Sequence, residues 1–89
     1  MPTISTFYGI IIRMYFFDTH QHAIPHIHAS HGDDAAVFSL DDGSVLAGSL
    51  PIRQTRLVQA WIELRTEQLQ ADWALATQGE PLFKIEPLR

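Results

Sequence analysis

The sequence predicts an α+β domain, and three observations support this fold class. Residues 1–50 alternate short runs of β-branched and aromatic side chains with turns that contain glycine and aspartate. Residues 51–78 instead repeat apolar side chains at three- and four-residue spacing, as the buried face of a helix does. Residues 1–89 suffice for one domain only. We therefore expect an antiparallel meander sheet of about four strands, packed on one side by a C-terminal helical region.

The first expected strand covers residues 8–17, which are β-branched and aromatic and too few for a stable helix. Its alternate residues are mostly apolar on both faces, so we place this strand in the centre of the sheet. Arg13 is the exception. A charge inside such a strand needs a carboxylate partner, a place at the rim of the sheet, or a ligand.

Residues 18–25 are expected to form a loop, because Pro25 disfavours helical backbone in the residue before it. Residues 26–30 then form the second strand. Side chains alternate between the two faces of a strand, so His26 and His28 point the same way. The apolar residues between and after them point to the core.

The third and fourth strands are expected at residues 35–40 and 45–50, joined as a hairpin. The turn between them contains Asp42 and Gly43, a pair that suits the positive φ angles of tight hairpin turns.

The helical region begins near Pro51, because proline loses no hydrogen bond in the first turn of a helix. It ends at Gly79, which a proline follows two residues later. The apolar stripe shifts near residues 65–68, so we expect either one bent helix or two helices. Residues 79–89 are expected to form an extended tail.

Charge and composition narrow the classes of function. The net charge is -4 with the histidines neutral, which argues against an extensive nucleic-acid surface. No run of about 18 apolar residues is present, so we expect no membrane span. The chain contains no cysteine, and its N-terminal apolar run lacks the features of a signal peptide, so we expect a cytoplasmic protein. A thin core and an exposed sheet edge also allow a homodimer.

All five histidines lie close together in the chain, and this cluster marks the expected site. Neutral imidazole is the commonest metal ligand in proteins. His26 and His28 lie about 7 Å apart along a strand, so their rings can converge on one ion, and His22 can add a third ligand. Three histidines with an open position suit catalytic zinc, whereas iron, nickel or manganese would fit if Asp18 or Asp33 joined.

A second hypothesis needs no metal. His26 and His28 can act as general base and acid near neutral pH. Arg13 or Lys84 can hold a phosphate, and Tyr15 can stack on a substrate or donate a hydrogen bond. These residues would form a nuclease-like toxin that cleaves RNA or another phosphodiester, with His26, His28, Arg13 and Tyr15 as its catalytic residues.

A third hypothesis is a protein-interaction domain whose histidines pack in an interface, so the sequence leaves open whether the protein is an enzyme. Three structural signs distinguish the hypotheses. Ring nitrogens that converge on one point would favour the metal. An anion-sized cleft flanked by Arg13 and a histidine would favour the nuclease, and buried histidines bonded to the backbone would favour the interaction domain.

The motif Pro-His-x-His-Ala at residues 25–29 is the most specific of several segments that resemble a known family. The other segments are residues 1–5, 7–10, 13–15, 48–51, 57–58, 61–64, 79–82 and 85–88, together with Trp73. They cover nearly the whole chain and are similar to DUF4160, a family of small bacterial proteins of unknown function. In many members an aspartate, a histidine and two prolines precede the motif. Here Asp18 and His22 match loosely, and Ile24 replaces the first proline.

The resemblance implies a small cytosolic protein that is encoded beside a second small protein, in a two-gene module like a toxin–antitoxin pair. It supports the histidine motif as the site but implies no reaction. Our leading hypothesis is therefore a protein of such a module that binds a divalent transition metal, zinc, iron or nickel, through His22, His26 and His28. The nuclease-like toxin and the interaction domain stay as alternatives.

Overall fold

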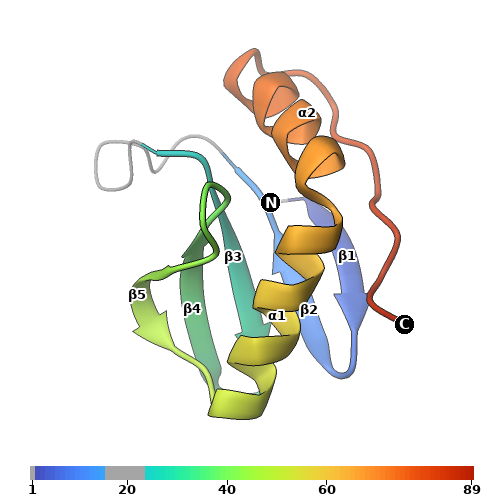
Figure 1. Ribbon diagram of the computed structural model, residues 1–89. Helices are drawn as coiled ribbons and strands as arrows, with labels where there is room; N and C mark the ends of the chain where they lie inside the picture. Colours follow the sequence, from blue (N-terminus) through green and yellow to red (C-terminus); the bar gives the residue numbers. More distant parts are fainter. Residues whose placement is uncertain (1, 16–23) are drawn as a thin grey trace.

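Five strands in the first half of the chain form one antiparallel sheet, and their order in the sheet is their order in the chain (Figure 1). The computed structural model describes residues 2–15 and 24–89. The strands are β1 (Thr3–Phe7), β2 (Ile10–Arg13), β3 (His26–His31), β4 (Asp34–Ser39) and β5 (Val45–Ser49). The predicted antiparallel meander is confirmed, with one strand more than expected.

The additional strand arises from a turn at Tyr8 and Gly9, inside the segment that we expected to be a single strand. These residues have positive φ angles of 49° and 76°, and two consecutive positive φ angles make the tight turn that joins antiparallel strands. The run before this turn, Thr3–Phe7, pairs with β2. The end of the expected strand, residues 16–17, lies outside the described residues.

Cross-strand pairing aligns two rows of residues across four strands. Direct partners in an antiparallel ladder lie on the same face of the sheet. The first row runs from β2 to β5 through Arg13, His28, Val37 and Ala47. The second row, in the same order, is Ile11, Ser30, Ala35 and Ser49. The rows are two residues apart on every strand, so they share one face.

Two helices follow the sheet, as one of the two expected alternatives had it. Helix α1 (Ile52–Leu64) crosses one face of the sheet, and α2 (Thr66–Thr77) continues beyond the end at which β1 and β3 begin (Figure 1). Arg65 separates them with φ -116° and ψ 23°. The Thr66 hydroxyl donates to the carbonyl oxygen of Ile62 at 3.0 Å, a bond that bends helices. Neither of these described helices is long and apolar enough to cross a membrane.

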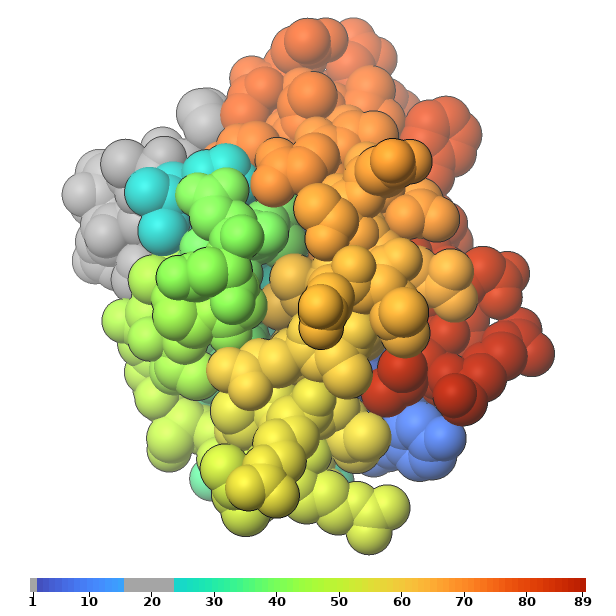
Figure 2. All heavy atoms as spheres, in the orientation of Figure 1, coloured from blue at the N-terminus to red at the C-terminus, as the bar shows by residue number. Residues whose placement is uncertain are grey.

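The hydrophobic core lies between the sheet and the helices. Trp61 of α1 is its largest fully buried side chain. The indole N–H of Trp61 donates to the backbone oxygen of Glu86 at 2.8 Å, and its ring centroid lies 5.3 Å from that of Phe7. Both helices form much of the surface on this side of the molecule (Figure 2). The core strand residues Ile27 and Ala29 of β3 pack within this layer.

The C-terminal tail, residues 79–89, runs beside β1 without regular secondary structure, as an extended tail should (Figure 1). The N–H of Ile85 donates to the carbonyl oxygen of Ile4 at 2.8 Å, and the side chain of Ile85 is buried. The N–H of Phe83 donates to Oδ1 of Asp72 on α2 at 3.0 Å. The tail is therefore held against both the sheet and α2.

Candidate functional site

The face of the sheet that carries the two cross-strand rows is the candidate site, and we call it the open face. Ile27 and Ala29 of β3 are fully buried in the core with the helices. Because side chains alternate along a strand, His28 and Ser30 point away from the helices. Both are half-buried, and no described helix covers them. An antiparallel sheet commonly packs one face and leaves the other to solvent or a ligand.

Tyr15 fixes the ring of His28 on the open face. The two rings are stacked, with centroids 4.3 Å apart and planes at 12°. The phenolic oxygen of Tyr15 lies 3.3 Å from Nδ1 of His28, within hydrogen-bonding distance. Stacking and this polar contact together restrict the rotation of the imidazole, so its other nitrogen, Nε2, keeps a defined direction.

Arg13 lies directly opposite His28 on the neighbouring strand. Its Nη1 donates to the hydroxyl oxygen of Ser30 at 3.5 Å, which is long and therefore weak for such a bond. Within the described part of the chain no carboxylate forms an ion pair with Arg13. Arg13 is the last residue of β2 and is half-buried, so of the three roles that the sequence allows for this charge, the rim of the sheet and a ligand both fit the described neighbourhood.

A hollow of about 160 Å³ lies between these side chains. Its lining comprises Arg13, Tyr15, His28, Ala29, Ser30 and Ala35. Pockets for whole small-molecule ligands usually measure about 300–1,000 Å³, so this hollow suits one chemical group such as a phosphate. Arg13 and a histidine thus flank an anion-sized cleft, which is the sign expected for the nuclease hypothesis. We call it the phosphate hollow.

His26 has the same direction on β3 as His28 but a different environment. Its exposed fraction is 0%, and it does not line the phosphate hollow. Its Nδ1 lies 2.7 Å from the carbonyl oxygen of Ile24, and since a carbonyl only accepts, this nitrogen carries the hydrogen. Its ring centroid lies 5.0 Å from the ring of Trp73 on α2 and 5.3 Å from that of His28. His26 is therefore buried and bonded to the backbone, and it meets the ring of His28 edge to face.

The metal hypothesis depends on a residue that the structure does not describe. His22, the predicted third ligand, and Asp18 lie outside the described residues. Among residues 2–15 and 24–89 no group of three or more histidine, cysteine, aspartate or glutamate side chains could hold a metal ion. The sequence also allowed Asp33 and Lys84 at the site. Neither residue lines this hollow.

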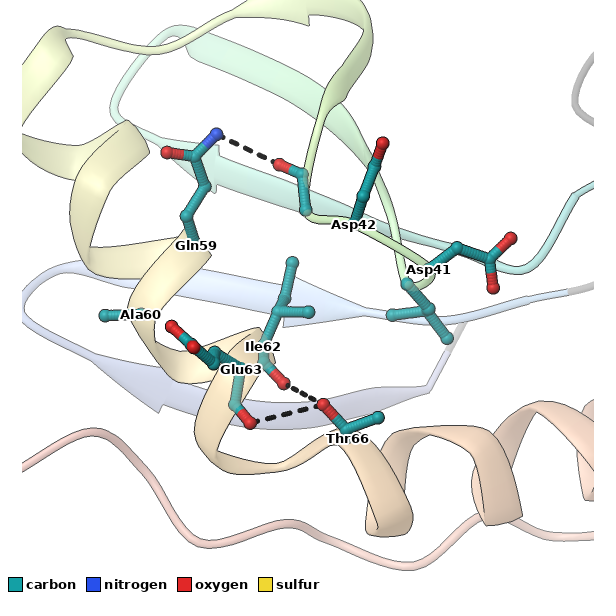
Figure 3. Close-up of a pocket in the computed structure, with 9 residues that line it drawn as sticks. Asp41, Asp42, Gln59, Ala60, Ile62, Glu63 and Thr66 are labelled. Atoms are coloured by element: carbon teal, nitrogen blue, oxygen red, sulfur yellow. Dashed lines mark hydrogen bonds between the residues drawn. The ribbon is translucent and has the colours of Figure 1, made fainter.

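A larger hollow of about 600 Å³ lies on the other side of the molecule, between α1 and the turn before β5 (Figure 3). Its walls carry the carboxylates of Asp41, Asp42 and Glu63. The Ser44 backbone N–H donates to Asp42, and this bond lowers the pKa of that carboxyl, so it is ionised at neutral pH. Gln59 donates its amide hydrogen to the backbone oxygen of Gly43 at 3.0 Å. This hollow would repel an anion and contains none of the expected site residues.

Two residues of the site were not among the expected catalytic residues. Ser30 lines the phosphate hollow and contacts Arg13. Ser30 is two residues after His28 on β3 and so shares its strand face, and this spacing could have placed Ser30 at the site from the sequence alone. Trp73 packs against His26 although the two residues are far apart in the sequence. The apolar stripe of the helix that contains Trp73 does not predict this contact.

The family resemblance is confirmed by comparison with known proteins. The sequence profile of the domain of unknown function DUF4160 matches residues 9–74. No curated protein and no solved structure matches the chain. The matched range is well over half of the chain and contains Arg13, His26 and His28. The protein therefore belongs to the DUF4160 family.

Proposed function

We propose that the protein cleaves single-stranded RNA at the phosphate hollow without a metal ion. His28 is the general base and Arg13 binds the phosphate that reacts. The observation that carries this proposal is their geometry: the two residues are direct cross-strand partners and line the same hollow. This is the nuclease hypothesis from the sequence with one change. His28 alone acts as the general base, whereas the sequence had suggested His26 and His28 as an acid–base pair.

The proposed reaction uses the nucleophile that RNA itself contains. His28 accepts the proton of the 2′-hydroxyl, and the 2′-oxygen forms a bond to the adjacent phosphorus. The bond between phosphorus and the 5′-oxygen breaks, and that oxygen takes a proton from a water molecule. The protonated His28 gives its proton to the hydroxide that remains, which restores both the water and the neutral imidazole. The products are a 2′,3′-cyclic phosphate and a 5′-hydroxyl. A histidine suits this role because its ordinary pKa lies near neutral pH.

Arg13 stabilises the negative charge that grows on the phosphate as the new bond forms. Guanidinium can donate two parallel hydrogen bonds to phosphate oxygens, and such charge-assisted bonds are stronger than bonds between neutral groups. The hydroxyl of Ser30 lies 3.5 Å from Nη1 of Arg13, so the guanidinium is on the open face beside the hollow. Tyr15 and His26 act as positioning residues, because each contacts the His28 ring.

Cleavage of a defined oligonucleotide in the presence of chelator tests this proposal. We expect tag-free protein to cleave a labelled single-stranded RNA in EDTA and to leave the 2′-deoxy version intact, since that version lacks the nucleophile. The His28→Ala variant should be inactive. His31→Ala is the matched control, because His31 lies on the same strand but outside the hollow. Cleavage that EDTA abolishes, or that His28→Ala retains, would contradict the mechanism.

A metal bound by His22, His26 and His28 is the second candidate. The edge contact between the rings of His26 and His28, with centroids 5.3 Å apart, favours it. Elemental analysis of tag-free protein after incubation with zinc, iron and nickel tests it against a variant with His26→Ala and His28→Ala. About one metal per chain, lost in the variant, would support the metal. If the wild-type protein binds no metal, the metal candidate is contradicted and only the acid–base proposal remains.

The proposed setting is a cytoplasmic two-gene module like a toxin–antitoxin pair, in which the protein encoded nearby covers the open face. His28 and Ser30 are half-buried on this face, away from the helices, which supports the idea. Co-expression and co-purification of both proteins test it. We expect the complex to lose RNA cleavage, and light scattering of the chain alone distinguishes a monomer from the homodimer that an exposed sheet edge allows.

A further inference from the structure

A second hollow, of about 110 Å³, lies beside the phosphate hollow on the open face. It is lined by His28, Ala35, Ala36, Val37, Ala47 and Gly48. His28 and Ala35 line both hollows, so the two are adjacent. Apart from His28 its walls are small apolar residues and backbone, whereas the phosphate hollow has Arg13. The two hollows therefore differ in the chemical group that each suits.

We infer that this second hollow binds the base of an unpaired nucleotide, and we call it the base hollow. The inference rests on the proposed function and names its substrate class: single-stranded RNA with one base placed flat on β4 and β5.

The order of groups along the sheet is fixed by the strand register. Arg13, His28, Val37 and Ala47 form one row from β2 to β5. Neighbouring strands lie about 4.8 Å apart, so the row spans roughly 14 Å. A cationic group stands at one end, the general base comes second, and an apolar surface occupies the other end.

Gly48 has no side chain, so it contributes only backbone to the base hollow. Its φ angle is 70°, and a Cβ built there would lie 2.3 Å from the backbone oxygen of Ala35. Only glycine fits this backbone. The neighbouring side chains of Val37 and Ala47 are small. A surface of small apolar side chains and backbone suits the face of an aromatic ring.

The covalent order within a nucleotide matches the order of the row. The base is attached to C1′, the reacting hydroxyl to C2′ and the phosphate to C3′. A 2′-hydroxyl at His28 and a phosphate at Arg13 therefore leave the base on the far side of His28, over Val37 and Ala47. A base in a duplex is stacked on both faces and paired along its edge, so only an unpaired base can lie there.

Binding of four ligands to wild-type protein tests the inference. The ligands are inorganic phosphate, ribose 3-phosphate, uridine 3′-monophosphate and adenosine 3′-monophosphate, followed by NMR amide shifts and calorimetry. We expect all four to shift amides near Arg13 and His28. Only the nucleotides should also shift Val37 and Ala47, and they should bind about tenfold more tightly than ribose 3-phosphate, as one stacked base usually contributes.

The Ala47→Leu variant fills the base hollow without touching Arg13. It should keep the affinity for inorganic phosphate and lose the advantage of the nucleotides over ribose 3-phosphate. Val45→Leu is the matched control, because Val45 is exposed on the same strand and lines neither hollow. It should behave like wild type. If Ala47→Leu does not fold, the affinities of wild-type protein for the nucleotides and for ribose 3-phosphate still show whether the base hollow binds a base.

The outcomes separate this inference from the proposed function. Nucleotides that bind no more tightly than ribose 3-phosphate, while phosphate still shifts His28, would overturn the base hollow and leave the phosphate site. No shift with any ligand, together with no RNA cleavage, would overturn the proposed function itself. Equal cleavage of single-stranded and duplex RNA of the same sequence would also overturn the base hollow.

Discussion

The two faces of the sheet differ in what their side chains do, and strand β3 shows the difference residue by residue. Ile27 and Ala29 have exposed fractions of 0% and 1% and pack under the helices. His28 and Ser30 alternate with them, are half-buried, and line the phosphate hollow. Stability and the proposed activity are thus carried by neighbouring residues that point in opposite directions. Substitutions on one face should change folding, and those on the other should change chemistry.

The largest expected effect is on the helix-covered face, at Trp61. The Trp61→Ala variant should lose about 3–5 kcal/mol of unfolding free energy, because it empties the centre of the core and removes the bond to Glu86. Small domains have about 5–15 kcal/mol in total, so the variant should be partly unfolded at 37 °C. Urea denaturation followed by circular dichroism measures this. A loss below about 1 kcal/mol would contradict the assignment of Trp61 as the core anchor.

The adjacent pair Ile27 and His28 should separate the two faces most sharply. Ile27→Ala should lower the unfolding free energy by about 2–5 kcal/mol and leave the cleavage rate of the folded fraction close to wild type. His28→Ala should reduce cleavage at least about 100-fold, as loss of a general base usually does. Its urea midpoint should change little, because the side chain is half-buried on the open face. Rates and midpoints measured on the same preparations test both.

If His28→Ala unfolds as readily as Ile27→Ala, the open face is part of the core and the comparison fails. The conservative His28→Gln variant guards against a purely structural effect. It keeps a polar side chain beside Tyr15 but has no group that titrates near neutral pH. It should fold like wild type and be inactive.

The sequence predicts the helix-covered face better than the open face, for a physical reason. Burial under helices leaves a periodic apolar pattern, which indicated the strand at residues 26–30 and the change of helix near Arg65. A strand of mixed polar residues such as Thr3–Phe7 has no such pattern, and it becomes a strand because β2 pairs with it. The turn at Tyr8 was missed because tyrosine rarely has a positive φ angle.

The candidate site was partly predictable for the same reason. The alternation of β3 placed His26 and His28 on one face, and the register then set Arg13 opposite His28. What the alternation could not predict is that the two histidines have different roles. His26 is buried by Trp73, which lies in α2 and reaches it only in the folded chain. A contact between distant segments leaves no local pattern in the sequence.

Arg13 offers a smaller test on the open face. Arg13→Lys keeps the charge but loses the planar pair of donors, so phosphate affinity and cleavage should fall about tenfold. Arg13→Gln should lose more and should also flatten the salt dependence of RNA binding. Each neutralised phosphate contributes a slope of about -0.7 in a plot of log affinity against log salt for single strands. Fluorescence anisotropy at several salt concentrations measures this. An unchanged slope in Arg13→Gln would remove Arg13 from the phosphate site.

Asp72 is a polar residue on the helix-covered side of the molecule. The smallest expected effect in the comparison of the two faces is the pH dependence of stability that its carboxyl causes. Its exposed fraction is 1%, and Oδ2 has no hydrogen-bond partner among the described residues. Burial raises the pKa of Asp72, although the N–H of Phe83 opposes the shift by donating to Oδ1. The folded chain therefore holds this proton more tightly than the unfolded chain. The contribution to stability is present at low pH and is lost as pH rises from about 4 through the folded pKa.

The Asp72→Asn variant removes this titration and keeps an oxygen that can accept from Phe83. Its urea midpoint relative to wild type should therefore rise as pH increases from about 3.5 to 7. Asp42→Asn is the control of opposite sign, because bonds from Ser44 lower the pKa of Asp42. Wild type should gain on that variant as pH rises, since the contribution of Asp42 is present above its unfolded pKa and lost as pH falls. If both variants shift in the same direction, the buried carboxyl of Asp72 does not titrate as its burial implies.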